Sequence, residues 1–178
     1  MAAHFGPTTW DDVQAMPDDG RRYESVAGVL TVTPAPGLSH RRAAFRLARL
    51  LADAAPLGVE VLPAPYDWWI SQIEWYEPDV IVFERFKATE RRLEVAPLLA
   101  VEVASPSTRL HDLNDKRAAY AANGCQNYWV VDPDEPSVLA FGLGASGYEA
   151  VARVRGDGRF EATEPFAAGF SPAQLVAD

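Results

Sequence analysis

The chain of 178 residues has little cysteine and histidine, and this scarcity excludes several kinds of site. Its one cysteine, Cys125, rules out an internal disulfide and fits a reducing cytoplasm. The three histidines are scattered and form no zinc-binding spacing. The chain also has no glycine-rich phosphate loop and no G-x-S-x-G nucleophile motif. The chemistry must therefore rest on other residue types.

Long apolar runs are missing as well. No stretch reaches the roughly 18 apolar residues of a membrane span, and no charged-then-apolar signal pattern opens the chain. We therefore expect a cytoplasmic protein that makes no membrane contact. With 48% hydrophobic and 23% charged residues, the composition is that of a globular protein. The length predicts a single domain over residues 1–178 with one core.

Positive charge is in short supply. There are 16 basic and 25 acidic residues, which gives a net charge of −9. Because nucleic acid is bound largely through neutralisation of its phosphates, this net charge opposes such binding at long range. Two local basic groups could still contact phosphates, although a solvated surface is the alternative for both. They are Arg41, Arg42, Arg46 and Arg49 in a predicted helix, and Arg85, Lys87, Arg91 and Arg92 in a predicted loop.

The order of the predicted elements indicates an α/β fold. The patterns predict first a short helix over 8–16 capped by Thr9, a hairpin over 22–32, and a helix that is capped by Ser39 and runs to residue 55. Strands follow over 59–62, 66–70, 80–83 and 98–104, and then a helix over 110–123 ended by Gly124. The last predicted elements are a strand over 127–132, an antiparallel pair over 138–143 and 148–155, and a tail over 165–178 that packs back. The helix between strands 98–104 and 127–132 is a crossover, so those strands should be parallel. The expected architecture is a mixed β-sheet core flanked by helices, with an N-terminal hairpin and a C-terminal antiparallel pair.

A carboxylate in the most apolar run is the most informative feature. Glu102 lies in the middle of Leu98–Ala104. Even an unpaired neutral polar group costs about 2–7 kcal/mol in such surroundings, and glutamate is almost never fully buried without a partner. The position therefore predicts a metal ion, a cation or a shared proton beside Glu102. A core arginine or a capped backbone group is the structural alternative.

Two further residues could accompany Glu102. Asp79 follows Pro78 at the start of a second apolar run, and the two acids can meet if their strands are neighbours. Lys116 lies on the helix that follows the Glu102 strand. The alternatives are a turn for Asp79 and, for Lys116, a solvated helix position paired with Asp112.

Metal-dependent phosphodiester cleavage requires residues of these types. One or two divalent cations polarise the phosphate and generate hydroxide, and Mg²⁺ is typically held by one or two carboxylates with waters. Asp79 and Glu102 would be ligands of Mg²⁺ or Mn²⁺, with the backbone carbonyl of Val103 as a third oxygen. Lys116 would stabilise the developing charge.

The same residues carry a family resemblance. Pro78-Asp79, followed by Glu102 in an apolar strand, resembles the PD-(D/E)XK nuclease superfamily of restriction-endonuclease-like folds. A longer pattern more specifically resembles the Uma2 family of restriction-endonuclease-like proteins. That pattern comprises 101–108, Asp112, Lys116, Tyr120, Gly124 and 128–133, together with Tyr23-Glu24, Gly28, 33–36 and His40 near the start.

The resemblance implies a restriction-endonuclease-like domain and a Mg²⁺-dependent endonuclease that acts on nucleic acid, with DNA the favoured substrate. Glu24 could add a third carboxylate from the hairpin, and His40 is a further candidate at the site, on the substrate side or in a structural role. Aromatic residues at Trp68-Trp69 and Trp75-Tyr76 fall on both faces of their strands. Core packing explains one of these faces. Because subunit interfaces are enriched in aromatics, we expect a subunit interface on the other face, and therefore a homodimer.

One departure from the superfamily pattern leaves the activity open. The superfamily lysine normally stands two residues after the acid, where this chain has Ala104. The Uma2 pattern places a lysine on the following helix instead, which is Lys116. This departure and the acidic net charge support a second hypothesis, a catalytically inactive nuclease fold that acts in binding or assembly.

Overall fold

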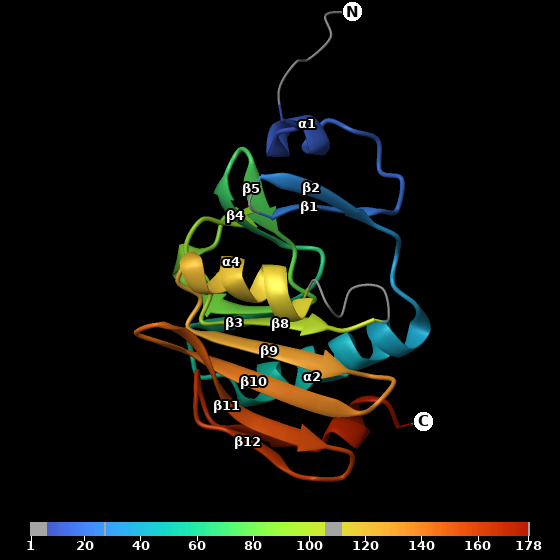
Figure 1. Ribbon diagram of the computed structural model, residues 1–178, viewed down its shortest axis with the longest axis vertical. Helices are drawn as coiled ribbons and strands as arrows, with labels where there is room; N and C mark the ends of the chain where they lie inside the picture. Colours follow the sequence, from blue (N-terminus) through green and yellow to red (C-terminus); the bar gives the residue numbers. More distant parts are fainter. Residues whose placement is uncertain (1–6, 27, 106–111, 178) are drawn as a thin grey trace, which may run out of the picture.

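The computed structural model describes residues 7–26, 28–105 and 112–177. Its elements form stacked layers, with one sheet toward the N-terminal end and a second sheet toward the C-terminal end (Figure 1). The helical elements are α1 (Trp10–Gln14), α2 (Leu38–Ala54), η1 (Arg85–Lys87), the π-helical turn η2 (Asp112–Lys116), α4 (Arg117–Ala122) and η3 (Pro172–Leu175). The strands are β1 (Arg22–Val26), β2 (Val29–Thr33), β3 (Val59–Pro63), β4 (Asp67–Ser71), β5 (Glu74–Tyr76), β6 (Val80–Glu84), β7 (Arg92–Leu93), β8 (Leu99–Val103), β9 (Asn127–Asp132), β10 (Ser137–Gly144), β11 (Gly147–Arg155), β12 (Phe160–Ala162) and β13 (Ala168–Phe170). The predicted α/β fold class is confirmed.

The larger sheet brings the two predicted acids to neighbouring strands. Its order is β11-β10-β9-β8-β6-β3. Strands β8 and β9 are parallel, as the crossover predicts, with Glu102 opposite Val130. Strands β6 and β8 are antiparallel, with Val80 opposite Val101. Asp79, immediately before β6, therefore lies next to the end of the Glu102 strand.

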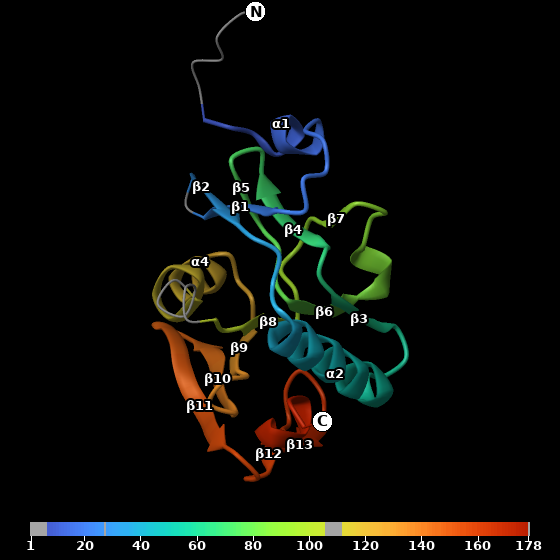
Figure 2. The same ribbon diagram turned by 90° about the vertical axis from the view of Figure 1, so that its right-hand side faces the viewer.

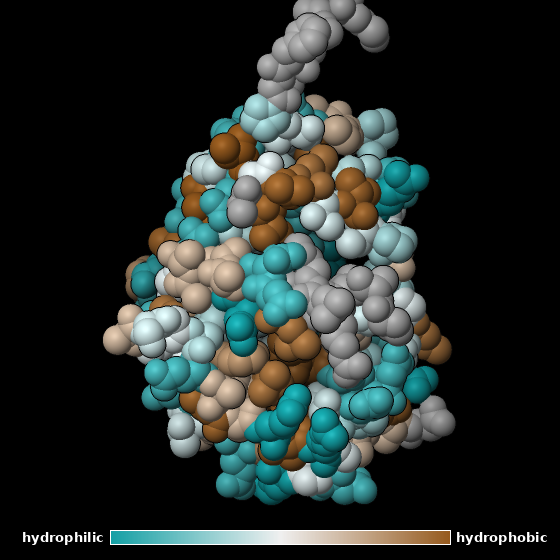
Figure 3. Space-filling model, in the orientation of Figure 1, coloured by the Kyte–Doolittle hydropathy of each residue, from teal (hydrophilic) through white to brown (hydrophobic). Residues whose placement is uncertain are grey.

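The smaller sheet supplies the other wall of the site. Its order is β2-β1-β5-β4-β7, and β1 and β2 form the predicted N-terminal hairpin. Strand β7 was not predicted, and β5 was expected only at the aromatic pair Trp75-Tyr76, because runs of two and three residues are too short to show a period. The apolar side chains in Figure 3 gather over this hairpin, where Val29 and Val32 are exposed.

Helix α2 covers one face of the larger sheet (Figure 2). Its predicted apolar stripe is buried there, and consists of Ala44, Leu47, Ala48 and Leu51. The C-terminal segment packs back as predicted, and Phe160 and Phe170 contact Trp129 at ring-centroid distances of 4.9 and 6.4 Å. None of the helices formed by the described residues combines the length and apolar character that a membrane crossing requires.

Helix α4 packs between the two sheets. The Tyr120 ring lies 5.3 Å from that of Trp68 and 4.9 Å from that of Tyr76, so these aromatics fill the chain's own core. On the other face of β4, Trp69 lies under the Arg92 guanidinium at 4.1 Å. Core packing therefore explains one face of the aromatic run as expected, while the subunit interface expected on the other face stays a prediction. The homodimer itself stays a prediction.

Two helix boundaries differ from the sequence prediction. Helix α2 begins at Leu38 after Gly37, without a side-chain cap, so the predicted capping role of Ser39 is wrong. The predicted helix over 110–123 is π-helical over Asp112–Lys116 and α-helical only from Arg117, while 110–111 lie outside the described residues. Gly124 ends α4 as predicted, in the left-handed region at φ 81°.

Candidate active site

A cleft of about 200 Å³ lies between the β1–β2 hairpin, the start of α2 and the ends of β6 and β8. All the site residues predicted from the sequence line this cleft: Glu24, His40, Asp79, Glu102, Val103 and Lys116. Five parts of the chain, at β1, α2, the start of β6, β8 and η2, therefore contribute to one site. Thr33 at the end of β2 and the loop over 34–37, between β2 and α2, also line the cleft.

Asp79 is held as an anion by three neighbours. Its Oδ2 accepts a hydrogen bond from the Val103 backbone N–H at 2.7 Å and lies 3.1 Å from Nε2 of His40. Its Oδ1 lies 2.8 Å from Nη1 of Arg22. Burial opposes ionisation, but the hydrogen bond from His40 and the charge of Arg22 outweigh it and lower the pKa of Asp79 to about 2. With only 2% of its surface exposed, Asp79 is no surface turn residue.

Glu102 has a lysine and a tyrosine as partners. Its Oε1 accepts a hydrogen bond from the Tyr120 hydroxyl at 2.6 Å and lies 3.1 Å from Nζ of Lys116. Burial and the nearby Glu102 charge raise the pKa of Tyr120 well above its usual value, so the hydroxyl remains a donor. The predicted cation beside Glu102 is thus present as the Lys116 ammonium.

Lys116 reaches the site from the π-helical turn. Only 3% of its surface is exposed, so the alternative of a solvated helix position is wrong. Its Nζ donates to Glu24 Oε1 at 2.8 Å and also contacts Glu102. The ammonium therefore bridges β1 and β8 from the helical side. The position that the superfamily lysine usually occupies is Ala104 in this chain.

Glu24 comes from the hairpin, and its Oε1 also accepts a hydrogen bond from the Glu77 backbone N–H at 2.9 Å. Arg22 and Glu77 were missed by the sequence reasoning, and they pair at 2.8 Å. Burial, opposed by the charge of Arg22, raises the pKa of Glu77 to about 7. Strand parity could have found Arg22, because residues two apart in a strand share a face and Glu24 is two positions away.

The donor set fits a hard divalent cation. Four carboxylates, those of Glu24, Glu77, Asp79 and Glu102, stand against the guanidinium of Arg22 and the ammonium of Lys116. Oxygen ligands and an excess of negative charge are what Mg²⁺ prefers. Asp79 Oδ1 is buried and has no well-aligned hydrogen bond, despite its closeness to Arg22. No trio of potential ligands has metal-site geometry within the described ranges, but one or two carboxylates with waters suffice for Mg²⁺.

Comparison with solved structures identifies the class. A crystal structure from Anabaena variabilis, of "a putative nuclease belonging to DUF820", has a TM-score of 0.77 and 18% sequence identity over 96% of this chain and 98% of that chain. At this identity the likeness shows the fold, so the chain is an α/β protein with a nuclease-like fold and an acidic cleft. The profile of the Uma2 family, described as "Putative restriction endonuclease", matches residues 10–176. The chain belongs to the Uma2 family. No curated protein matches it.

Proposed function

We propose that this chain is a divalent-metal-dependent nuclease that hydrolyses phosphodiester bonds of nucleic acid, with DNA as the expected substrate. The observation that carries the proposal is the convergence of Asp79, Glu102 and Lys116, from β6, β8 and the π turn, on one cleft. Membership in the Uma2 family and the similarity to a protein described as a nuclease support the same class.

Each residue has a role in this proposal. Asp79 and Glu102, with the main-chain carbonyl of Val103, would hold Mg²⁺ or Mn²⁺. When bound, the ion would polarise the phosphate and supply hydroxide. The Lys116 ammonium offsets negative charge that develops at the phosphate. Tyr120 fixes the Glu102 carboxylate through its 2.6 Å hydrogen bond.

Cleavage of a panel of single-stranded and duplex DNA and RNA with Mg²⁺ or Mn²⁺ tests the proposal. We expect at least one substrate to be cut, and Glu102→Ala to abolish cutting because it removes a ligand. The control is Glu161→Ala, which removes an exposed glutamate of β12 outside the cleft. A folded wild-type protein that cuts no substrate with either ion would contradict the proposal.

A second candidate function is a non-catalytic module that keeps the nuclease fold for binding or assembly. It is favoured by the protein groups that already engage the carboxylates, because Arg22 and His40 contact both oxygens of Asp79. Calorimetric titration with Mn²⁺ separates the two candidates. A nuclease site should bind the ion and lose binding in Asp79→Asn, whereas no binding by the wild-type protein would favour the module.

A further inference from the structure

A second groove, of about 450 Å³, opens from the candidate active site and runs along α2. It shares Arg22, His40 and Asp79 with the cleft, so the two hollows are continuous at the Asp79 carboxylate. Beyond these shared residues, α2 contributes Arg41 and Phe45 to its wall. A ligand that lies in this groove therefore reaches the site from the α2 side.

The outer face of α2 carries an aromatic side chain between two cations. Arg41, Phe45 and Arg49 are four residues apart, which places them on one face of the helix, with about 6 Å of axial rise between neighbours. The Phe45 side chain is 61% exposed, although its ring is large and apolar. These three residues are called the α2 stripe below.

The cations of the α2 stripe are available to an anionic ligand. Arg41 Nε donates to the Pro36 carbonyl oxygen at 3.0 Å, which fixes the guanidinium at the rim of the cleft. Within the described part of the chain, neither Arg41 nor Arg49 has a carboxylate partner. Helix α2 contains four arginines and one acid, Asp53 near its end, in a chain of net charge −9. The helix is therefore a local basic surface on an acidic protein.

We propose that the α2 stripe guides an unpaired nucleic-acid strand into the cleft, with a base stacked on Phe45 and phosphates on Arg41 and Arg49. The inference rests on the proposed function, whose substrate class it narrows. Aromatic side chains in basic grooves are the usual platform for single strands, because every unpaired base offers a flat face. A base inside a duplex is already stacked on both sides and has no face to offer Phe45.

The burial of the carboxylates favours the same kind of substrate. Asp79 and Glu102 are each 2% exposed at the bottom of a cleft of about 200 Å³. A phosphate must enter this cleft to meet them, and a single strand can bend its backbone inward at a low cost. A duplex is stiff over many base pairs, so bending it into the cleft would cost more free energy.

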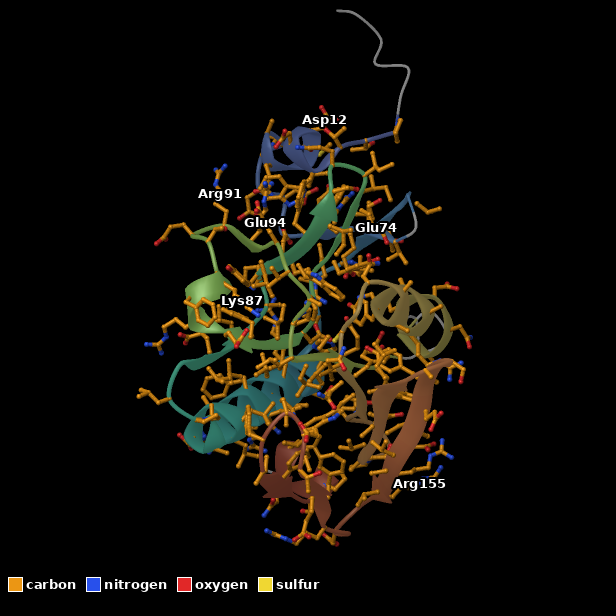
Figure 4. All side chains as sticks on the ribbon, turned by 90° about the vertical axis from the view of Figure 1, so that its left-hand side faces the viewer. Asp12, Glu74, Lys87, Arg91, Glu94 and Arg155 are labelled. Carbon is orange, nitrogen blue, oxygen red and sulfur yellow. The ribbon has the colours of Figure 1, made fainter. Side chains whose placement is uncertain are left out.

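Singly exposed apolar residues are common on protein surfaces, so the test needs a matched control. Phe86 of η1 supplies one. Its side chain is 79% exposed and lies 5.7 Å from the Lys87 ammonium, so it is also an aromatic beside a cation. It does not line the groove. In Figure 4, Lys87 marks the position of η1, and Arg155 lies on β11 across the view from α2.

Fluorescence anisotropy with labelled oligothymidylate and with a labelled duplex measures the interaction. Ca²⁺ is present to offset the acidic cleft, and the integrity of each strand is checked on a gel. Phe45→Ala should weaken single-strand binding about tenfold, since stacking on an aromatic contributes roughly that factor per base. Phe86→Ala should leave it unchanged. The duplex should bind more weakly and respond to neither substitution.

The salt dependence tests the phosphate contacts separately. Arg41→Ala should reduce the slope of log affinity against log salt concentration by about 0.7, the value for one phosphate contact with a single strand. Arg155→Ala removes an exposed arginine of β11 and should leave the slope as it is. Equal slopes for Arg41→Ala and the wild-type protein would contradict a phosphate contact at Arg41.

The outcomes separate this inference from the proposed function. If the wild-type protein cleaves nucleic acid while Phe45→Ala binds the single strand normally, the α2 stripe does not bind the strand, but the proposed nuclease activity is supported. If the binding pattern is as expected but no metal supports cleavage, single-strand binding by the α2 stripe is supported and the proposed nuclease activity is contradicted. If the wild-type protein fails to bind the single strand, or Phe45→Ala weakens the duplex equally, the proposal of an unpaired strand is overturned. Thermal melting verifies that each variant is folded.

Discussion

At the scale of single residues, the site is a set of buried charges that hold one another in place. The Lys116 ammonium lies between Glu24 and Glu102, at 2.8 and 3.1 Å. Removing one member of a buried ion pair typically costs about 3–5 kcal/mol, because the remaining charge is left uncompensated. Lys116 therefore stabilises the fold in addition to any part it takes in chemistry, so loss of activity alone would not define its role.

A carboxylate outside the cleft predicts how stability changes with pH. Asp67 Oδ2 accepts a hydrogen bond from Nε1 of Trp10 at 2.6 Å, but burial raises the pKa of Asp67 to about 6. The folded chain therefore holds a proton that the unfolded chain, with a pKa near 3.9, has already lost. The contribution of Asp67 to stability is fully present below about pH 4 and is lost as pH rises through about 6.

We expect Asp67→Asn to remove this loss, because an amide keeps an acceptor for Trp10 and does not ionise. Relative to the wild-type protein, the variant should gain about 1–3 kcal/mol in unfolding free energy between pH 4 and pH 8. Urea denaturation at both pH values measures the change. Asp53→Asn, at an exposed position of α2, is the control. A difference between Asp67→Asn and wild type that is the same at both pH values would refute the assignment.

The residues of the site were predictable only where the sequence showed a contrast. Glu102 was evident because a charged residue is unexpected in the middle of an apolar strand, and Asp79 because it begins another such strand. Arg22 and Tyr120 do not differ from their neighbours in this way. Arg22 lies in a hairpin whose pattern predicts a half-exposed strand, and Tyr120 lies on a helix, where a tyrosine is common. Their contacts with Asp79 and Glu102 depend on how the layers stack, which local patterns do not contain.

At the scale of elements, length decided what the sequence could reveal. The buried strands β6, β8 and β9 have five or six residues each, and their apolar runs were evident. Strands β5 and β7 depend on pairing with β4 more than on any pattern of their own. The π-helical turn was also missed, because the spacing of apolar residues does not distinguish one wide turn from α-helix.

The end of α4 offers a test of backbone strain alone. Gly124 has φ 81°, and a Cβ added there would meet only the Cβ of Ala96, at 3.9 Å. Gly124→Ala should therefore lower the unfolding free energy by about 1–2 kcal/mol through the left-handed backbone. Gly124→Asn should lower it by less than Gly124→Ala does, because asparagine tolerates the left-handed region better than alanine. Urea denaturation of both variants checks this, and equal effects would count against the strain argument.

At the scale of the whole molecule, a net charge of −9 makes any cation stabilising to some degree. Counter-ions screen the repulsion among acidic groups, and this effect needs no site. A bound divalent ion adds a separate term, because an ion that binds only the folded chain raises stability by about 2.7 kcal/mol at 100 times its Kd. A test of the metal site must therefore separate site binding from screening.

Thermal melting in Mn²⁺, compared with NaCl at matched ionic strength, makes this separation. If Asp79 and Glu102 hold the ion, Mn²⁺ should raise the Tm well beyond the matched salt, since binding adds to screening. In Asp79→Asn the two increments should become equal, whatever the variant's own Tm, because only the screening part remains. The exposed Asp53→Asn should keep the excess. Equal increments in the wild-type protein would mean that the carboxylates of the cleft are balanced by Arg22, Lys116 and protons alone, and they would contradict a metal-dependent nuclease.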